Sequence, residues 1–219
     1  MILNDKQILR LCQENQLLDP YVNHSVKTKL ICPKEIHCES QVEYEKIISY
    51  GLSSYGYDLR LADEFKVFYP KQTVDPKYGI HGSPSTAVTI TDPYHTIDPK
   101  KELNFYTEKD RGYVVIPAGS FALGRSIEYI KMPRNITGLA TNKSTYARCG
   151  LNTPSTVLEA GWEGHLTIEM FNSTPHPIKV YSNEGIIQVL FFQGEDCLTS
   201  YSDRDGKYQG QKGVTGAKV

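Results

Sequence analysis

Residues 161–171 read GWEGHLTIEMF, and their alternation decides the expected fold class. Leu166, Ile168 and Met170 occupy every second position, which predicts a β-strand with these side chains toward a core. Glu169 then lies on the opposite face between apolar neighbours. Partial desolvation there would raise the pKa of its carboxyl toward the range that suits proton transfer. An exposed strand carboxylate is the alternative on periodicity alone.

Similar β-rich runs recur along the chain, separated by Gly, Pro, Asn and Asp. They predict strands at 57–61, 64–69, 113–116, 120–130, 136–140, 165–171, 178–180 and 185–192. No helical pattern lies between most of these runs. The spacing therefore predicts an all-β protein, built as a barrel or a sandwich with a few short helices.

Helical periodicity is confined to the N-terminal part of the chain. Apolar residues at a spacing near 3.6 predict a helix between Ile2 and Leu17, with Asn4 or Asp5 as its N-cap. A second short helix is predicted near residues 42–49, so that residues 1–50 would form a helical segment.

The remaining composition suggests one domain over residues 1–219. Residues 70–112 are rich in Pro, Gly, Asp and Lys, which predicts a surface excursion of that domain without a core of its own. The segment 202–219 has almost nothing to bury, and composition alone predicts a frayed terminus.

Charge and hydropathy limit the classes of partner. The 219 residues include 24 basic and 25 acidic residues, for a net charge of −1. This balance argues against a nucleic-acid polymer or an anionic membrane as partner. No apolar run approaches the roughly 18 residues of a transmembrane helix, and Asp5 and Glu14 argue against a signal peptide. The five cysteines are irregularly spaced, which favours free thiols in a cytoplasmic protein.

Residues 37–39 read HCE, an H-x-E that zinc-dependent nucleobase deaminases combine with a C-x-x-C. The sequence contains no C-x-x-C, and Cys32 and Cys38 are not at a usual zinc-ligand spacing. We therefore expect no zinc. Phosphate-loop, dinucleotide-binding and nucleophile-elbow motifs are also absent from the sequence.

Residues 143–148 read KSTYAR and concentrate hydrogen-bond donors at one bend. They predict a turn that enters a short helix, with Ser144 or Thr145 as its cap. Free backbone N–H groups beside Lys143 and Arg148 would suit an anion such as phosphate. An ordinary capped helix with solvated charges explains this stretch better when it is taken alone.

Several separated motifs follow one another in a characteristic order. They are MILNDK at 1–6, SSYGYDLR at 53–60, KSTYAR at 143–148, EAGWEG at 159–164, TIE at 167–169, QVLFF at 188–192 and YSDRDGKYQGQ at 201–211. In this order, over nearly the whole chain, the sequence resembles the dCTP deaminases of the dUTPase-like superfamily.

The resemblance implies a dUTPase-like distorted β-barrel, or β-clip, assembled as a homotrimer with active sites between subunits. The implied reaction is hydrolysis of dCTP to dUTP and ammonia, which feeds dUMP and dTTP synthesis. It implies no zinc, and Mg²⁺ would accompany the triphosphate as a charge partner.

The resemblance also assigns site residues, one position at a time. Glu169 matches the catalytic acid/base, and Ser144 and Arg148 match the pair that places the water and the cytosine. The implied substrate-binding positions are Lys143, Ser144, Thr145, Tyr146, Ala147, Arg148, Glu159, Thr167, Ile168, Glu169, Gln188, Tyr201, Lys207 and Gln211. Glu159 stands where many relatives carry Asp beside the sugar, and Pro154 where they carry a polar residue. The flexible tail would close over the nucleotide.

Two alternatives use the same fold. A dUTP diphosphatase, or a bifunctional enzyme that makes dUMP directly, would use Glu159 to orient water at the α-phosphate. A catalytically silent nucleotide sensor would not need Glu169, Ser144 and Arg148 together. Sequence leaves the choice among dCTP, dCMP and modified cytosine nucleotides open.

Overall fold

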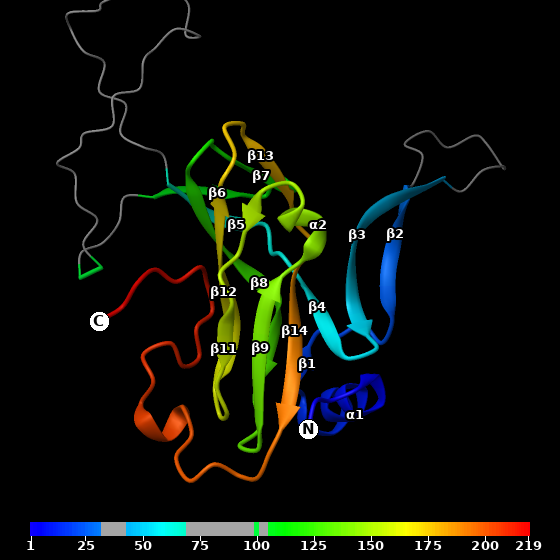
Figure 1. The fold of residues 1–219 in the computed structure, drawn as a ribbon, viewed down its shortest axis with the longest axis vertical. Helices are drawn as coiled ribbons and strands as arrows, with labels where there is room; N and C mark the ends of the chain where they lie inside the picture. Colours follow the sequence, from blue (N-terminus) through cyan, green and yellow to red (C-terminus); the bar gives the residue numbers. More distant parts are fainter. Residues whose placement is uncertain (32–42, 69–98, 101–104) are drawn as a thin grey trace, which may run out of the picture.

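The computed structural model describes residues 1–31, 43–68, 99–100 and 105–219. Two antiparallel sheets pack across one shared apolar core (Figure 1). The first sheet contains β1 (Leu18–Asp19), β5 (Glu64–Val67), β6 (Tyr106–Lys109), β8 (Phe121–Lys131), β10 (Leu151–Asn152) and β12 (Glu163–Asn172). The second contains β2 (Ser25–Ile31), β3 (Glu43–Ser53), β4 (Gly56–Arg60), β9 (Ile136–Asn142), β11 (Thr156–Leu158) and β14 (Gly185–Gln193). A ribbon of β7 (Tyr113–Ile116) and β13 (Ile178–Tyr181) completes the strands.

This architecture confirms the expected all-β class. Each predicted strand is present, with ends shifted by a residue or two wherever the structure describes them. Alternation in β12 is as expected, because Leu166, Ile168 and Met170 are buried at 6%, 1% and 0% exposure. The strands that sequence did not predict are β1, β2, β3, β6, β10 and β11.

The N-terminal helix is α1, Asp5–Asn15. Asn4 is its N-cap: its side chain accepts from the N–H of Gln7, and the Gln7 side chain accepts from the N–H of Asn4. This reciprocal capping box satisfies two backbone donors that the helix itself leaves free. Ile8 and Cys12 then pack into the core on one face of the helix.

The predicted helix near 42–49 is wrong, and so is the reading of residues 1–50 as helical. The described part of that stretch belongs to β3, which pairs with β2 and β4. Its β-branched and aromatic residues suit a strand, and pairing on both sides outweighs the weak helical period.

The expected surface excursion at 70–112 lies mostly outside the described residues. At its described end, β6 is a mostly exposed strand that the sequence did not predict, and it pairs with β5 at the edge of the first sheet. The H-x-E at 37–39 lies outside the described residues as well. Of the cysteines that the structure describes, Cys12, Cys149 and Cys197 are free thiols. Among the residues that the structure describes, no helix is long and apolar enough to cross a membrane.

The C-terminal tail, residues 202–219, contradicts the prediction from composition. It begins with the 3₁₀ turn η3 (Ser202–Arg204) and then runs beside β11 and β12 (Figure 1). Gln211 forms a parallel β-bridge with Gly164, and Val214 is only 7% exposed. The tail is folded onto the barrel because backbone hydrogen bonds replace the large apolar side chains that it lacks.

Candidate active site

A cavity of about 560 Å³ lies between the outer face of β12, strand β11 and the tail. Its lining combines one strand carboxylate, several aromatic rings and a basic tail. The residues are Phe105, Phe121, Leu123, Thr156, Val157, Leu158, Glu159, Trp162, Leu166, Thr167, Glu169, Tyr201, Lys207, Tyr208, Gln211, Thr215, Gly216 and Ala217. We call this cavity the pocket.

Glu169 projects from β12 into the pocket, beside its cross-strand partner Leu123. One side of the residue is exposed in the single chain, yet the surrounding atoms displace enough water from the carboxyl to raise its pKa. In the described part of the protein, no other side chain forms a hydrogen bond or ion pair with this carboxylate. The raised pKa confirms the expectation from alternation and leaves the group suited to exchange protons.

Main-chain hydrogen bonds attach the tail to the first residues of β12. The N–H of His165 donates to the carbonyl of Gln211 at 2.9 Å, and the N–H of Gly210 donates to the carbonyl of Glu163 at 2.8 Å. Gly164 has φ +148°, and a Cβ there would come within about 3.0 Å of the Gln211 backbone. Only glycine therefore allows the tail to approach β12 this closely.

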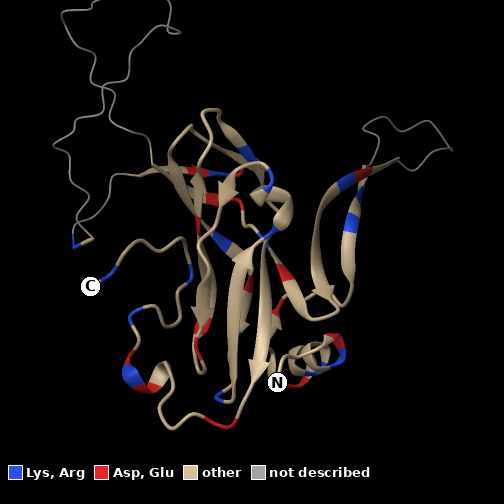
Figure 2. Cartoon of the chain, in the orientation of Figure 1, with Lys and Arg blue, Asp and Glu red and all other residues tan. Residues whose placement is uncertain are grey.

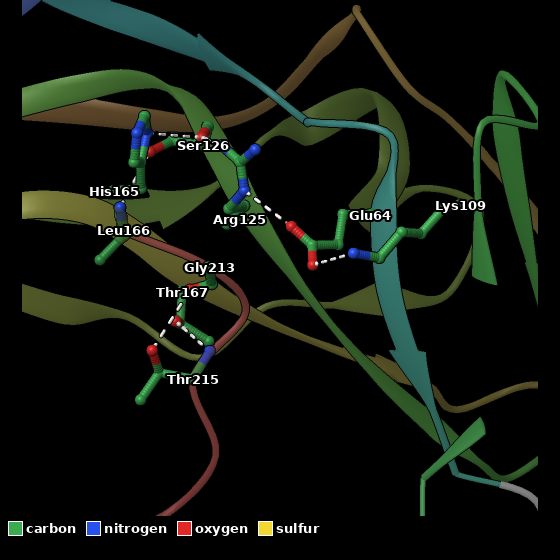
Figure 3. Close-up of polar contacts among 9 residues, drawn as sticks. All are labelled: Glu64, Lys109, Arg125, Ser126, His165, Leu166, Thr167, Gly213 and Thr215. Atoms are coloured by element: carbon green, nitrogen blue, oxygen red, sulfur yellow. Dashed lines mark hydrogen bonds and ion pairs between the residues drawn. The ribbon is translucent and has the colours of Figure 1, made fainter. Parts of the chain in front are cut away.

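Side chains of the pocket wall hold the tail at two further points. The indole N–H of Trp162 donates to the carbonyl of Tyr208 at 3.0 Å. Thr167 accepts from the N–H of Thr215 at 3.3 Å (Figure 3). Gln211 lines the pocket, and its buried Oε1 has no hydrogen-bond partner in the described chain.

Positive charge comes to the pocket mainly from the tail, where Lys and Arg recur along the ribbon in Figure 2. The Lys207 ammonium donates to the carbonyl of Lys218 at 2.8 Å, a contact that leaves its charge unneutralised. Arg204 differs, because it forms an ion pair with Glu159 at the pocket rim.

A neighbouring cation, Arg125, is also neutralised. It lies opposite Thr167 on β8, and its Nε is 3.1 Å from the carboxylate of Glu64 (Figure 3). The same carboxylate contacts Lys109 at 2.8 Å, and these two cations lower the pKa of Glu64. Lys207 is thus the cation that lines the pocket without a carboxylate partner in the described chain.

The predicted bend at 143–148 forms α2 (Ser144–Ala147), but its details differ from the expectation. Lys143 is the N-cap, and neither Ser144 nor Thr145 caps the helix. The Lys143 ammonium is 2.5 Å from the Asp58 carboxylate, and these side chains are only 11% and 10% exposed. Lys143 is therefore committed to the fold, whereas Ser144, Thr145 and Arg148 are exposed.

Two predicted contact residues point into the core. Tyr146 is 3% exposed, and its hydroxyl accepts from the N–H of Tyr181 at 2.9 Å. Burial raises the pKa of this phenol. Ile168 is 1% exposed on the core side of β12. Each of the two can face a ligand only through its backbone.

Within one chain the predicted residues other than Ile168, which faces the core, fall into two groups. Glu159, Thr167, Glu169, Tyr201, Lys207 and Gln211 line the pocket. The others, Lys143 to Arg148 and Gln188, are absent from that lining and form what we call the α2 group. Gln188 on β14 lies opposite both Asp58 and Thr141, next to the Lys143–Asp58 pair.

Comparison with known proteins places this arrangement in a family. A family model described as dCTP deaminase-like matches residues 2–194. The chain belongs to the dCTP deaminase-like family. Two relatives named dCTP deaminase, from Chromobacterium violaceum and Dichelobacter nodosus, are each 42% identical over 98% of this chain and 97% of the relative.

The fold agrees with that membership. The crystal structure of 2′-deoxycytidine 5′-triphosphate deaminase from Agrobacterium tumefaciens aligns with a TM-score of 0.50 at 17% identity. The alignment covers 90% of this chain and about half, 49%, of that longer chain. At this identity the likeness concerns the fold, which is the expected dUTPase-like β-barrel.

Sequence reasoning did not assign several residues that line the pocket of this family member. Phe105, Phe121, Leu123 and Thr215 carry no recognisable motif. The alternation of β8 indicates that Phe121 and Leu123, two residues apart, lie on the same face of the strand. Only the β8–β12 register shows that this face is the one that carries Glu169.

Proposed function

We propose that the protein catalyses hydrolytic deamination of dCTP to dUTP and ammonia, with Glu169 as the proton carrier. The observation that supports this role most directly is an unpaired, partly desolvated carboxylate in the wall of a pocket that a basic tail covers. Family membership and the dCTP deaminase relatives support the substrate.

The reaction needs four proton movements around C4 of cytosine. Water loses its first proton as its oxygen bonds to C4, and N3 gains one. The C4 hydroxyl then loses the second proton as the C4 carbonyl forms, and the amino group gains one before the C4–N bond breaks. One carboxyl group beside N3 and C4 can perform all of these transfers when its pKa lies near neutrality. Glu169 would carry the first proton from water to N3 and the second from the C4 hydroxyl to the leaving amine.

The exposed donors of the α2 group would enter from a second copy of the chain. Ser144 and Arg148 do not line the pocket of their own chain. We therefore propose a homotrimer in which Ser144 and Arg148 of a partner subunit place the water and the cytosine beside Glu169.

The tail would bind the triphosphate and exclude water. Lys207 has no carboxylate partner among the described residues, so its charge is available to phosphate. No three His, Cys, Asp or Glu side chains of the described chain form a metal site. Mg²⁺ commonly binds substrate phosphates with few protein ligands, and here it would be held by the triphosphate and neutralise part of its charge.

The diphosphatase alternative finds less support. It requires Glu159 to orient water at the α-phosphate, but Arg204 already occupies that carboxylate. We therefore propose deamination without hydrolysis of the triphosphate.

Incubation with dCTP and Mg²⁺, followed by chromatography of the nucleotides, tests the proposal. We expect dUTP and one equivalent of ammonia. Formation of dUMP would identify a bifunctional enzyme, and unchanged dCTP would contradict the proposed function.

A further inference from the structure

The wall beside Glu169 is apolar where Phe121 and Leu123 of β8 line the pocket. Leu123 is the cross-strand partner of Glu169, and Phe121 is the next residue on the same face. Phe105 approaches Phe121 edge-to-face, with ring centroids 5.7 Å apart. Phe68 stacks on Phe121 at 5.1 Å and 16°, so the Phe121 ring is held between two others.

This apolar wall, formed by Phe105, Phe121 and Leu123, has no side-chain hydrogen-bonding group. A polar edge of a base placed against it would lose its bonds to water without replacement. Cytosine has one apolar edge, C5–C6, and C5 is bonded directly to C4. If Glu169 serves N3 and C4, as the proposed function requires, the C5 edge is the one that can face this wall.

We propose that the apolar wall makes the protein accept cytosine deoxynucleotides with a methyl group at C5, alongside dCTP itself. This inference rests on the proposed function. With 5-methyl-dCTP the water oxygen becomes the C4 carbonyl oxygen and the amino group leaves as ammonia. The product is dTTP, and no oxidant or reductant is needed.

The wall also predicts an order among C5 substituents. A methyl group buried against aromatic carbon gains roughly up to fourfold in binding. A hydroxymethyl group places a hydroxyl against the same carbon, and an unpaired buried hydroxyl loses roughly five- to a hundredfold. We expect 5-methyl-dCTP to match or exceed dCTP in kcat/KM, and 5-hydroxymethyl-dCTP to fall well below both.

Initial rates of the full chain with Mg²⁺ and each of the three nucleotides test this order. A 5-methyl-dCTP efficiency more than about tenfold below that of dCTP would overturn the inference, since a pocket that merely excludes one methylene discriminates by that much. Absence of dCTP turnover would instead count against the proposed function, so the two failures are distinguishable.

Variants of Phe121 and Phe171 test whether the apolar wall causes the preference among C5 substituents. Phe121→Ser puts a hydroxyl into the wall. It should raise the ratio of kcat/KM for 5-hydroxymethyl-dCTP to kcat/KM for 5-methyl-dCTP at least fivefold. Phe121→Leu should keep the native order of the three nucleotides. Phe171→Ser is the matched control, because Phe171 is the cross-strand partner of Phe121 but does not line the pocket. Thermal melting of each variant checks that it folds, and the ratio is read only within a folded variant. An equal change in Phe121→Ser and Phe171→Ser would overturn the assignment to this wall.

Discussion

Glu169 in the pocket and Lys143 in the α2 group are held in opposite ways. Glu169 faces the pocket without a side-chain partner in the described chain, and burial raises its pKa. Lys143 lies 2.5 Å from Asp58 with both side chains about one-tenth exposed, at 11% and 10%. A buried ion pair positions its segment, whereas an unpaired carboxylate can exchange protons. Residue type alone therefore does not distinguish a reactive charge from a structural one.

Removal of the pocket carboxylate should have the largest effect. Glu169→Gln should lower kcat by about 10²–10⁴-fold while dCTP binding is retained, because the amide cannot carry protons. Product chromatography and calorimetric titration measure the two quantities. Glu163→Gln on the same strand is the control, since Glu163 does not line the pocket. Near-normal turnover in Glu169→Gln would remove Glu169 from the mechanism.

Mixed assemblies should show whether the two groups meet between copies. Glu169→Gln and Arg148→Ala should each be inactive alone. Trimers that contain both variants should recover about one third of native activity, because one of their three head-to-tail interfaces combines the intact residues of two chains. Assemblies purified through two different tags provide the measurement. No recovery in mixed assemblies of confirmed composition would place both residues in one chain's site.

The Lys143–Asp58 pair can be broken from the carboxylate side. Asp58→Ala leaves a nearly buried ammonium without its partner and should cost about 3 kcal/mol of unfolding free energy. Urea denaturation measures the change. The control is Glu45→Ala, which removes the partner of Lys29 from a pair that is 57% and 52% exposed. Such an exposed pair should contribute less than about 1 kcal/mol. Equal losses of unfolding free energy in the two variants would show that the Lys143–Asp58 pair does not stabilise the fold.

The contact between the pocket wall and the tail should have a smaller effect. Trp162→Phe removes the hydrogen bond to the Tyr208 carbonyl, worth about 1 kcal/mol. We expect KM for dCTP to rise roughly fivefold with kcat nearly unchanged, because the tail binds but does not react. Steady-state kinetics measure both. Tyr21→Phe on the exposed surface should change neither. A fall in kcat without a change in KM would argue against a binding role for this contact.

The smallest expected effect concerns stability and pH. A raised carboxyl pKa means that the ionised form of Glu169 is less stable in the fold than in the unfolded chain. Glu169→Gln should therefore unfold at a slightly higher temperature than the native chain above that raised pKa. The gain should stay below about 1 kcal/mol, because one side of the residue remains solvated. It should disappear as pH falls below the ordinary carboxyl range. Melting curves of the native chain and Glu169→Gln at pH 4 and pH 8 provide the measurement. A higher melting temperature of the variant at pH 4 alone would contradict the expected pH dependence.

Features that depend on near neighbours along the chain could be predicted from the sequence. The alternation of β12 predicted both its core face and the environment of Glu169. Asn4 was a predicted cap of α1, and a capping box needs only residues three positions apart. Motif order predicted the family. These signals are local, or are read one after another along the chain, so no knowledge of spatial pairing is required.

Contacts between residues far apart in sequence could not be predicted, because they depend on how the segments pack in the fold. Lys143 finds its partner 85 residues away in Asp58, and this contact removes it from the free cations expected at the bend. The tail is ordered by backbone bonds to β12, near Gly164, which composition cannot reveal. The stretch near 42–49 is a strand because β2 and β4 pair with it. In each case the observed structure is stabilised by contacts between segments far apart in sequence. Local periodicity does not predict such contacts.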